Sequence, residues 1–430
     1  MRRLLAFLFV LVTAAPAYAV TVERVVSPGG IEAWLVQDHS NPIVSLSLAM
    51  QGGAGVEAKP GLAHMVAGLL DEGAGPYDSQ TFQGKLEDLA IELSFDAGKD
   101  NFHGNLKTLS DHRNTAFDLF RLALTQPRFD KEPVERVRNQ ILTVLARELQ
   151  NPETVAARAW YHMVFAGHPY GVPVRGEPAT VKAITTAALK AYAKTWLSRE
   201  GMVISVVGDV TPEQLKPLLD STFGALPARH PALTVPDTQA QAAGKIEVIA
   251  RDNPQSVAMF GSAGIKRDDP QWYAAYVMNY VLGGGGFSSW LTEEVREKRG
   301  LAYSVYSYLT PMDHAGIISG GVATQNARTG ESVKLIKEQF ARMAKDGLTD
   351  KELADAKTYL TGSFALQLDS TSSIASLLTA VQLDNLGIDY LDKRNGYIQA
   401  VTADQVKDVA QRLLDPDKLT FVVVGKPEGL

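Results

Sequence analysis

The chain has 430 residues, of which 45% are hydrophobic and 21% charged, with eight histidines and no cysteine. This composition is typical of a globular protein of two-domain length, and it excludes disulfides, thiolate nucleophiles and cysteine-ligated metal centres. The net charge of −6, without a run of lysine or arginine, argues against a nucleic-acid partner. Any metal would have to be held by histidines and carboxylates.

The first nineteen residues have the pattern of a secretory signal peptide. Arg2 and Arg3 precede an apolar run from Leu4 to Val12, and Ala17-Tyr18-Ala19 is a small-x-small cleavage site. That run is too short to span a bilayer, and no later stretch approaches eighteen consecutive apolar residues. We expect cleavage after Ala19, no membrane span, and a periplasmic or secreted mature protein with a net charge near −8.

The hydrophobic pattern predicts both strands and helices. Apolar and polar residues alternate at 43–48 and 317–322, which indicates strands, and apolar residues recur at helical spacing at 134–148 and 330–345. Runs of strands are followed by runs of helices instead of alternating strictly with them. The sequence therefore indicates α+β domains in which helices pack on a largely antiparallel sheet.

A segment from Pro60 to Gly73 has a proline suited to a helix start and a glycine suited to its end. Within it, Gly61, Ala63 and His64 match the zinc helix G-x-A-H-x-x-E-H, and the segment resembles that helix in the pitrilysin/insulinase family of zinc peptidases, which includes the mitochondrial processing peptidases. In the family's motif, two histidines one turn apart hold zinc, and the glutamate is the general base for the attacking water.

The residues that the resemblance would assign to zinc are mostly replaced. Ala67 stands at the position of the general base and Gly68 at that of the second histidine. The family's third ligand is a glutamate on a later helix, where Thr143 and Val144 occupy the paired acidic positions. No two histidines are three to five residues apart, although spacing does not exclude ligands that folding brings together. We therefore expect no metal in this chain, with only His64 in a ligand position.

An internal repeat indicates duplication. Residues 184–209 align without a gap with residues 401–426 at a constant offset of 217. Any helix followed by a strand shares part of this pattern, but an ungapped register over 26 residues favours two homologous tandem domains. We place them at 20–227 and 245–430, joined by a linker at 228–244 that is rich in proline and alanine.

The strongest resemblance to the family lies in residues 281–305, which read VLGGGGFSSWLTEEVREKRGLAYSV. The resemblance implies that Arg296 and Tyr303 reach across a closed chamber to a zinc site on the opposing half or partner, where they hold the substrate carbonyl and the oxyanion. Fixed hydrogen-bond donors suit a developing negative charge. The residues alone leave two other interpretations, a surface ion pair between Arg296 and Glu293 and a half-buried strand that begins at Tyr303.

Four glycines precede this pair, namely Gly283, Gly284, Gly285 and Gly286. They do not form a phosphate-binding loop, because no G-K-[ST] follows at the required spacing. They are interpreted either as a flexible loop or, as the resemblance implies, as a loop that binds substrate and guides peptide into the chamber. The segment 92–105 occupies the place of the family's edge strand, which pairs with substrate backbone, but it departs from the usual pattern.

The resemblance covers residues 22–428, and it is asymmetric, since the metal positions are lost while the Arg/Tyr pair is kept. We predict a non-catalytic subunit of an exported heterodimeric zinc metallopeptidase, forming half of a clamshell chamber for peptides or unfolded polypeptides. A homologous partner would carry H-x-x-E-H and the zinc. The alternatives are a structural or peptide-binding scaffold, comparable to the core subunits that this family contributes to respiratory complexes, and an autonomous hydrolase with a site around His64 and His103.

Overall fold

The computed structural model describes residues 20–430. The expected signal peptide, residues 1–19, lies outside the described residues. Across residues 20–430, no helix combines the length and the apolar character that crossing a membrane requires.

The N-terminal half is a mixed sheet of six strands with helices packed on it. Its strand order is β1-β2-β6-β3-β5-β4, in which only the β2–β6 pair is parallel. The elements are β1 (Glu23–Val26), β2 (Glu32–Gln37), β3 (Ile43–Gln51), α1 (Leu62–Ala67), α2 (Ser79–Asp88), β4 (Glu92–Ala97), β5 (Asn101–Leu109), α3 (Arg113–Thr125), α4 (Lys131–Glu148), α5 (Pro152–Val164), α6 (Pro178–Lys182), α7 (Thr186–Trp196), β6 (Val203–Gly208) and α8 (Pro212–Phe223).

The C-terminal half repeats this plan with five strands. Its strand order is β7-β11-β8-β10-β9, with β7–β11 as the parallel pair. The elements are β7 (Ile246–Ala250), β8 (Gln255–Ala263), α9 (Trp272–Asn279), β9 (Ala302–Met312), β10 (Ala315–Gln325), α10 (Thr329–Asp346), α11 (Asp350–Gly362), α12 (Thr371–Leu383), α13 (Tyr390–Gln399), α14 (Ala403–Leu413) and β11 (Thr420–Gly425).

These elements confirm the α+β prediction and the homology of the two halves. The predicted strands lie within β3 and β10, and the predicted helices within α4 and α10. The bounds of α7 and β6 differ from those of α14 and β11 by 217 residues at every end. Residues 228–244 form neither helix nor strand.

The prediction of one helix from Pro60 to Gly73 was wrong at both ends, because α1 spans only Leu62–Ala67. Gly68 closes the helix by donating its N–H to the carbonyl of His64 at 3.1 Å. Glycine disfavours helix interiors, and the chain turns after it so that Leu69 and Leu70 become fully buried. The glycine at the second-histidine position therefore shortens the helix as well as removing the ligand.

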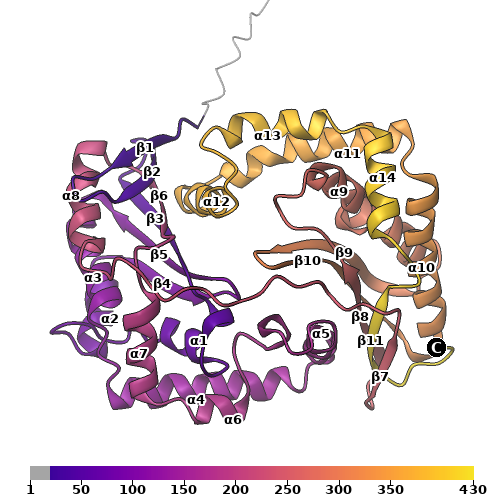
Figure 1. Ribbon diagram of the computed structural model, residues 1–430, viewed down its shortest axis with the longest axis horizontal. Coiled ribbons are helices and arrows are strands. Elements are labelled where there is room, and N and C mark those ends of the chain that lie inside the picture. Colours follow the sequence, from indigo (N-terminus) through magenta and orange to yellow (C-terminus); the bar gives the residue numbers. More distant parts are fainter. Residues whose placement is uncertain (1–19) are drawn as a thin grey trace, which may run out of the picture.

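Each half contributes one helix to the sheet of the other half (Figure 1). Helix α5 from the N-terminal half packs on β8 and β11, and α12 from the C-terminal half packs on β3 and β6. Both helices have 13 residues. Their bounds differ by 219 residues at each end, so they are duplicates of one element.

The α5 contact is a dense apolar one. Trp160 is fully buried against the C-terminal sheet, and its indole Nε1 donates to the carbonyl of Thr420 at 3.1 Å. Gly261 on β8 gives the ring room, since a Cβ there would lie 2.6 Å from the indole. The reciprocal helix α12 buries Ala375 and Leu378 against the N-terminal sheet. The two halves are therefore joined by packed surfaces as well as by the connecting segment.

Replacing Trp160 by alanine tests this packing. We expect Trp160→Ala to lower the free energy of unfolding by about 3–5 kcal/mol, because it leaves a cavity between the halves and an unpaired carbonyl. Chemical denaturation measures the change. His162→Ala, an exposed position on the same helix, is the control and should stay within about 0.5 kcal/mol of the unaltered chain. Equal stability of the two variants would contradict the packing argument.

Candidate functional site

His64 lies in α1 and lines a cavity of about 290 Å³ together with residues of β4, α4 and α5. Burial, followed by the positive charge of Arg175, lowers the pKa of His64 below its ordinary value. The imidazole is therefore neutral at pH 7, as a metal ligand would have to be. The position of His64 fits the ligand role that the resemblance assigns to it, but its partner in the structure is not a metal-binding group.

A guanidinium lies beside His64. Nε of Arg175 donates to Nε2 of His64 at 3.4 Å, and Nη1 of Arg175 donates to Oε1 of Glu148. Arg158 on α5 extends the network, with Nη1 at 3.9 Å from Glu148 and Nη2 at 3.7 Å from Glu177. Arg175 thus connects His64 on α1 with Glu148 at the end of α4. In a metal-binding relative, a bound cation would connect these two helices.

The other metal positions offer no ligand atoms. Ala67 is buried, and Gly68 faces α4, where a Cβ would lie 3.4 Å from Cγ1 of Val137. The hydroxyl of Thr143 donates to the carbonyl of Asn139 at 2.8 Å, and Val144 carries no donor or acceptor in its side chain. In the part of the chain that the structure describes, no group of three or more His, Asp or Glu side chains is placed to hold a metal ion. This donor set does not fit zinc.

Glu57 is a residue of this region that the sequence reasoning missed. Its carboxylate accepts hydrogen bonds from the backbone N–H groups of Gly61 and Ala63, both at 2.8 Å, and so caps the start of α1. Burial raises the pKa of Glu57 to about 7. The sequence held one indication of this role. Glu57 stands shortly before Pro60, the expected start of the helix, and carboxylates stabilise helix N-termini.

The Arg/Tyr pair of the C-terminal half is brought together. Arg296 lies in a π-helical segment, Thr292–Glu297, and its Cζ is 5.2 Å from the ring centroid of Tyr303 at the start of β9. Cζ also lies 4.5 Å from the ring centroid of Phe287. Tyr303 is 83% exposed and Phe287 is 72% exposed. The part-buried guanidinium thus contacts two exposed aromatic rings, and such contacts stabilise the position of a cation.

The sequence left two other interpretations of this pair, an ion pair between Arg296 and Glu293 and a half-buried strand that begins at Tyr303. The structure tests both. Glu293 pairs with Lys298 at 2.9 Å, whereas Arg296 pairs with its neighbour Glu297 at 3.3 Å, so the expected i,i+3 ion pair is not formed. Tyr303 does lie at the start of a half-buried strand, β9, in which Val305 and Ser307 are buried, but the side chain of Tyr303 itself is exposed. Phe287 was not foreseen, because no local pattern in the sequence indicates that its ring lies beside Arg296.

The four glycines have different surroundings. Gly283 is buried against β9, and a side chain there would overlap with Ser307. Gly284 and Gly285 lie close to Asn279 and Tyr280, whereas Gly286 has a φ of +57° and open space around it. The buried end of this loop therefore supports β9, and the exposed end presents Phe287.

Removal of the guanidinium beside His64 has two expected effects. Arg175→Ala leaves the partly buried carboxylate of Glu148 without its closest partner, so the free energy of unfolding should fall by about 1–3 kcal/mol. The pKa of His64 should rise toward its ordinary value, because a nearby positive charge is lost. Chemical denaturation and NMR titration of the imidazole measure these changes.

Arg147→Ala is the matched control, since Arg147 is an exposed arginine of α4, next to Glu148. Neither the stability nor the pKa of His64 should change in that variant. An unchanged His64 pKa in Arg175→Ala would show that the guanidinium does not lie beside the imidazole in solution.

Comparisons with known proteins agree with this geometry. Residues 33–177 match the family model described as insulinase (peptidase family M16), and residues 183–360 match the one described as peptidase M16 inactive domain. The crystal structure of a peptidase M16 inactive domain from Pseudomonas fluorescens superimposes with a TM-score of 0.88 at 31% identity, covering 94% of this chain and 98% of that one.

Relatives with curated names differ in what those names say. An uncharacterized zinc protease of Streptomyces coelicolor is 28% identical over 407 residues, which cover 92% of this chain and 87% of the relative. The non-peptidase homolog YmxG of Helicobacter pylori is 26% identical over 396 residues, which cover 90% of each protein. One relative is named a protease and the other a non-peptidase, although their identities to this chain are similar. Sequence identity therefore does not separate the two classes, and the residues at the site must do so.

Proposed function

We propose that this chain, which belongs to the insulinase (peptidase M16) family, is the non-catalytic subunit of an exported heteromeric zinc metallopeptidase. One observation carries the proposal. The Arg175 guanidinium lies beside His64, the only residue left in a ligand position, while the part-buried Arg296 remains adjacent to the exposed Tyr303. The chain therefore retains the part of a family active site that acts on substrate and lacks the part that holds metal.

In the proposed complex, Arg296 and Tyr303 act in trans. A guanidinium and a phenol are fixed donors that would bind the substrate carbonyl and the oxyanion next to the partner's metal. Contact with Phe287 and Tyr303 restricts the guanidinium before substrate arrives, which reduces the ordering required in the transition state. The zinc, which supplies the activated water, belongs to an H-x-x-E-H partner in this proposal.

The export and the substrate class rest on separate arguments. The signal-peptide pattern of residues 1–19 supports a periplasmic or secreted location. Peptides or unfolded polypeptides are the substrates that the family resemblance supports.

A structural or peptide-binding scaffold is the second candidate. The reciprocal packing of α5 and α12 favours it, because this packing joins the two halves firmly without any contribution from the Arg/Tyr pair. The name of the Helicobacter relative, a non-peptidase homolog, is compatible with both candidates.

The two candidates predict different mutant kinetics. The chain is purified with an H-x-x-E-H homologue from the same organism, and cleavage of unfolded peptides is assayed. We expect Arg296→Ala to lower kcat by about 10²–10³-fold, the usual effect of removing one oxyanion donor, and Tyr303→Phe to lower it as well, without loss of association. Arg299→Ala is the matched control, since Arg299 pairs with Glu294 and does not contact the aromatic rings.

The lone chain provides the decisive comparison. It should contain no stoichiometric zinc and should cleave nothing by itself, because its donor set does not fit the metal. Stoichiometric zinc together with activity in the lone chain would refute the proposal. Unaltered kcat in both Arg296→Ala and Tyr303→Phe would leave the scaffold as the function.

A further inference from the structure

The C-terminal sheet carries two exposed tyrosines on its edge strand. Tyr306 and Tyr308 are exposed on β9, whereas the residues before and between them are buried, so both rings lie on the face turned away from the core. Their ring centroids lie 5.1 Å apart. Tyr306 pairs with Gly321 on β10, and a Cβ at Gly321 would lie 2.9 Å from Cζ of the tyrosine. The missing side chain therefore lets the Tyr306 ring lie over the neighbouring strand.

A cavity of about 250 Å³, which we call the tyrosine groove, separates Tyr306 from α5. One wall is formed by α5, which packs on β8 and β11, and the other wall by Ser304 and Tyr306 of β9. The floor consists of small and apolar residues of β8 and β10, namely Val257, Ala258, Met259, Gly321, Val322 and Ala323. This volume suits a single side chain or a small molecule of that size.

Glu153 is the only charged residue that lines the tyrosine groove. It lies in the first turn of α5, and between residues 20 and 430 its carboxylate has no hydrogen-bond or ion-pair partner. The start of a helix carries about half an elementary positive charge, which does not balance a full carboxylate. Burial, followed by the negative charge of Glu153, raises the pKa of Tyr306, so this phenol is neutral at pH 7. The groove therefore combines an unbalanced negative charge with aromatic rings, whose faces are also negatively polarised.

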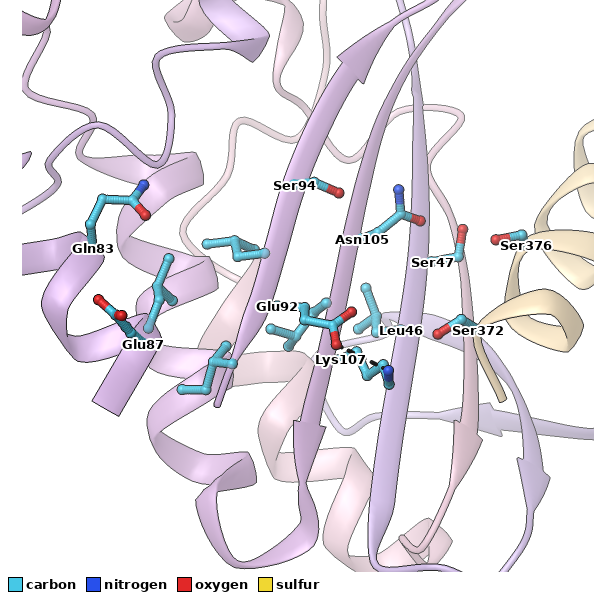
Figure 2. Close-up of a pocket in the computed structure, with 14 residues that line it drawn as sticks. Leu46, Ser47, Gln83, Glu87, Glu92, Ser94, Asn105, Lys107, Ser372 and Ser376 are labelled. Carbon is cyan, nitrogen blue, oxygen red and sulfur yellow. Dashed lines mark hydrogen bonds and ion pairs between the residues drawn. The ribbon is translucent and has the colours of Figure 1, made fainter. Parts of the chain in front are cut away.

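The duplicate position in the N-terminal half is chemically different. There, α12 and the edge strand β4 line a cavity with Glu87, Glu92, Lys107 and several serines (Figure 2). Lys107 pairs with Glu92 at 3.0 Å, and no aromatic residue lines that cavity. The aromatic groove is therefore specific to the C-terminal half and does not follow from the shared fold alone.

We propose that the tyrosine groove binds an organic cation with a short apolar stem, an alkylammonium or alkylguanidinium group. The ring of Tyr306 attracts a cation through its quadrupole, Glu153 supplies the opposite charge, and the apolar floor accommodates the stem. Free alkylamines and the basic side chains of a polypeptide share this chemistry. The groove is complete within one chain, so the proposal requires neither a partner subunit nor Arg296.

Neutral and anionic ligands of the same shape are disfavoured for physical reasons. A neutral stem would gain only the apolar contact with the floor, and an anion would be repelled by Glu153 and by the ring faces. The discrimination is moderate, because the groove is open to water and exposed charges are screened by salt.

An NMR titration of the mature chain, labelled with ¹³C in its tyrosine rings, tests the proposal. The resonance of Tyr306 is identified by its loss in Tyr306→Phe. The probes are the N-acetyl methylamides of lysine, norleucine and glutamate. The lysine derivative should shift this resonance and bind about fivefold more tightly than the norleucine derivative, which corresponds to about 1 kcal/mol. Added salt should reduce that advantage, because part of it is electrostatic.

A fourth probe, n-butylamine, distinguishes the two sources of such a cation. Binding as tight as that of the lysine derivative supports a free alkylamine as the ligand, since the amine and its stem then suffice. Weaker binding of n-butylamine supports a basic side chain whose backbone adds contacts.

Substitutions in the groove should remove the preference for the cation. Glu153→Gln and Tyr306→Leu are each expected to weaken the lysine derivative about fivefold, whereas Tyr306→Phe, which keeps the ring, should retain most of the affinity. Glu213→Gln is the matched control, because Glu213 is also an exposed glutamate in the first turn of a helix that starts with proline, α8, and lies outside the groove.

Three outcomes would overturn the proposal. They are binding of the norleucine or glutamate derivative at least as tight as that of the lysine derivative, unaltered affinity in Glu153→Gln, and no shift of the Tyr306 resonance with either amine. Glu153 is exposed, so its substitution by glutamine keeps the test valid even if Tyr306→Leu does not fold. These results are independent of the kinetics of the two-chain complex, which decide the proposed function.

Discussion

The reciprocal packing of α5 and α12 is the constraint on which the arrangement of this molecule depends. Each helix leaves its own half and fills the exposed face of the other half's sheet, so neither sheet is covered by local elements alone. Trp160 is the largest fully buried side chain of the α5 contact. The bridging helices also line cavities, since Thr154 and Arg158 of α5 line the cavity beside His64, and Ser372 and Ser376 of α12 line a cavity at β4 and β5.

The cavity beside His64 shows how a family site is lost without loss of the fold. A metal site requires several donors at one point, and Ala67, Gly68 and Val144 provide none. Arg175 places a positive charge next to His64 instead, and Glu148 neutralises it. A guanidinium needs only hydrogen-bond acceptors, so it connects α1 and α4 in surroundings that cannot bind zinc. The network extends through Arg158 to α5 and thereby reaches the helix that bridges the halves.

The C-terminal half keeps its Arg/Tyr pair, because contacts that do not involve a metal hold these residues in place. Arg296 is positioned by two aromatic rings from separate elements, and β9 is supported through Gly283 and Ser307.

The sequence by itself determined the α+β class, the duplication, the family and the loss of the zinc ligands, because periodicity, an ungapped repeat and motif positions are local properties of the chain. It also placed Arg296 close to Tyr303, since a short segment separates them. Only the tertiary structure decided that α1 ends at Ala67, that Arg175 lies beside His64, and that Phe287 completes the Arg296 site. These features depend on contacts between residues distant along the chain or on competition between packing and local preference, which no single segment encodes.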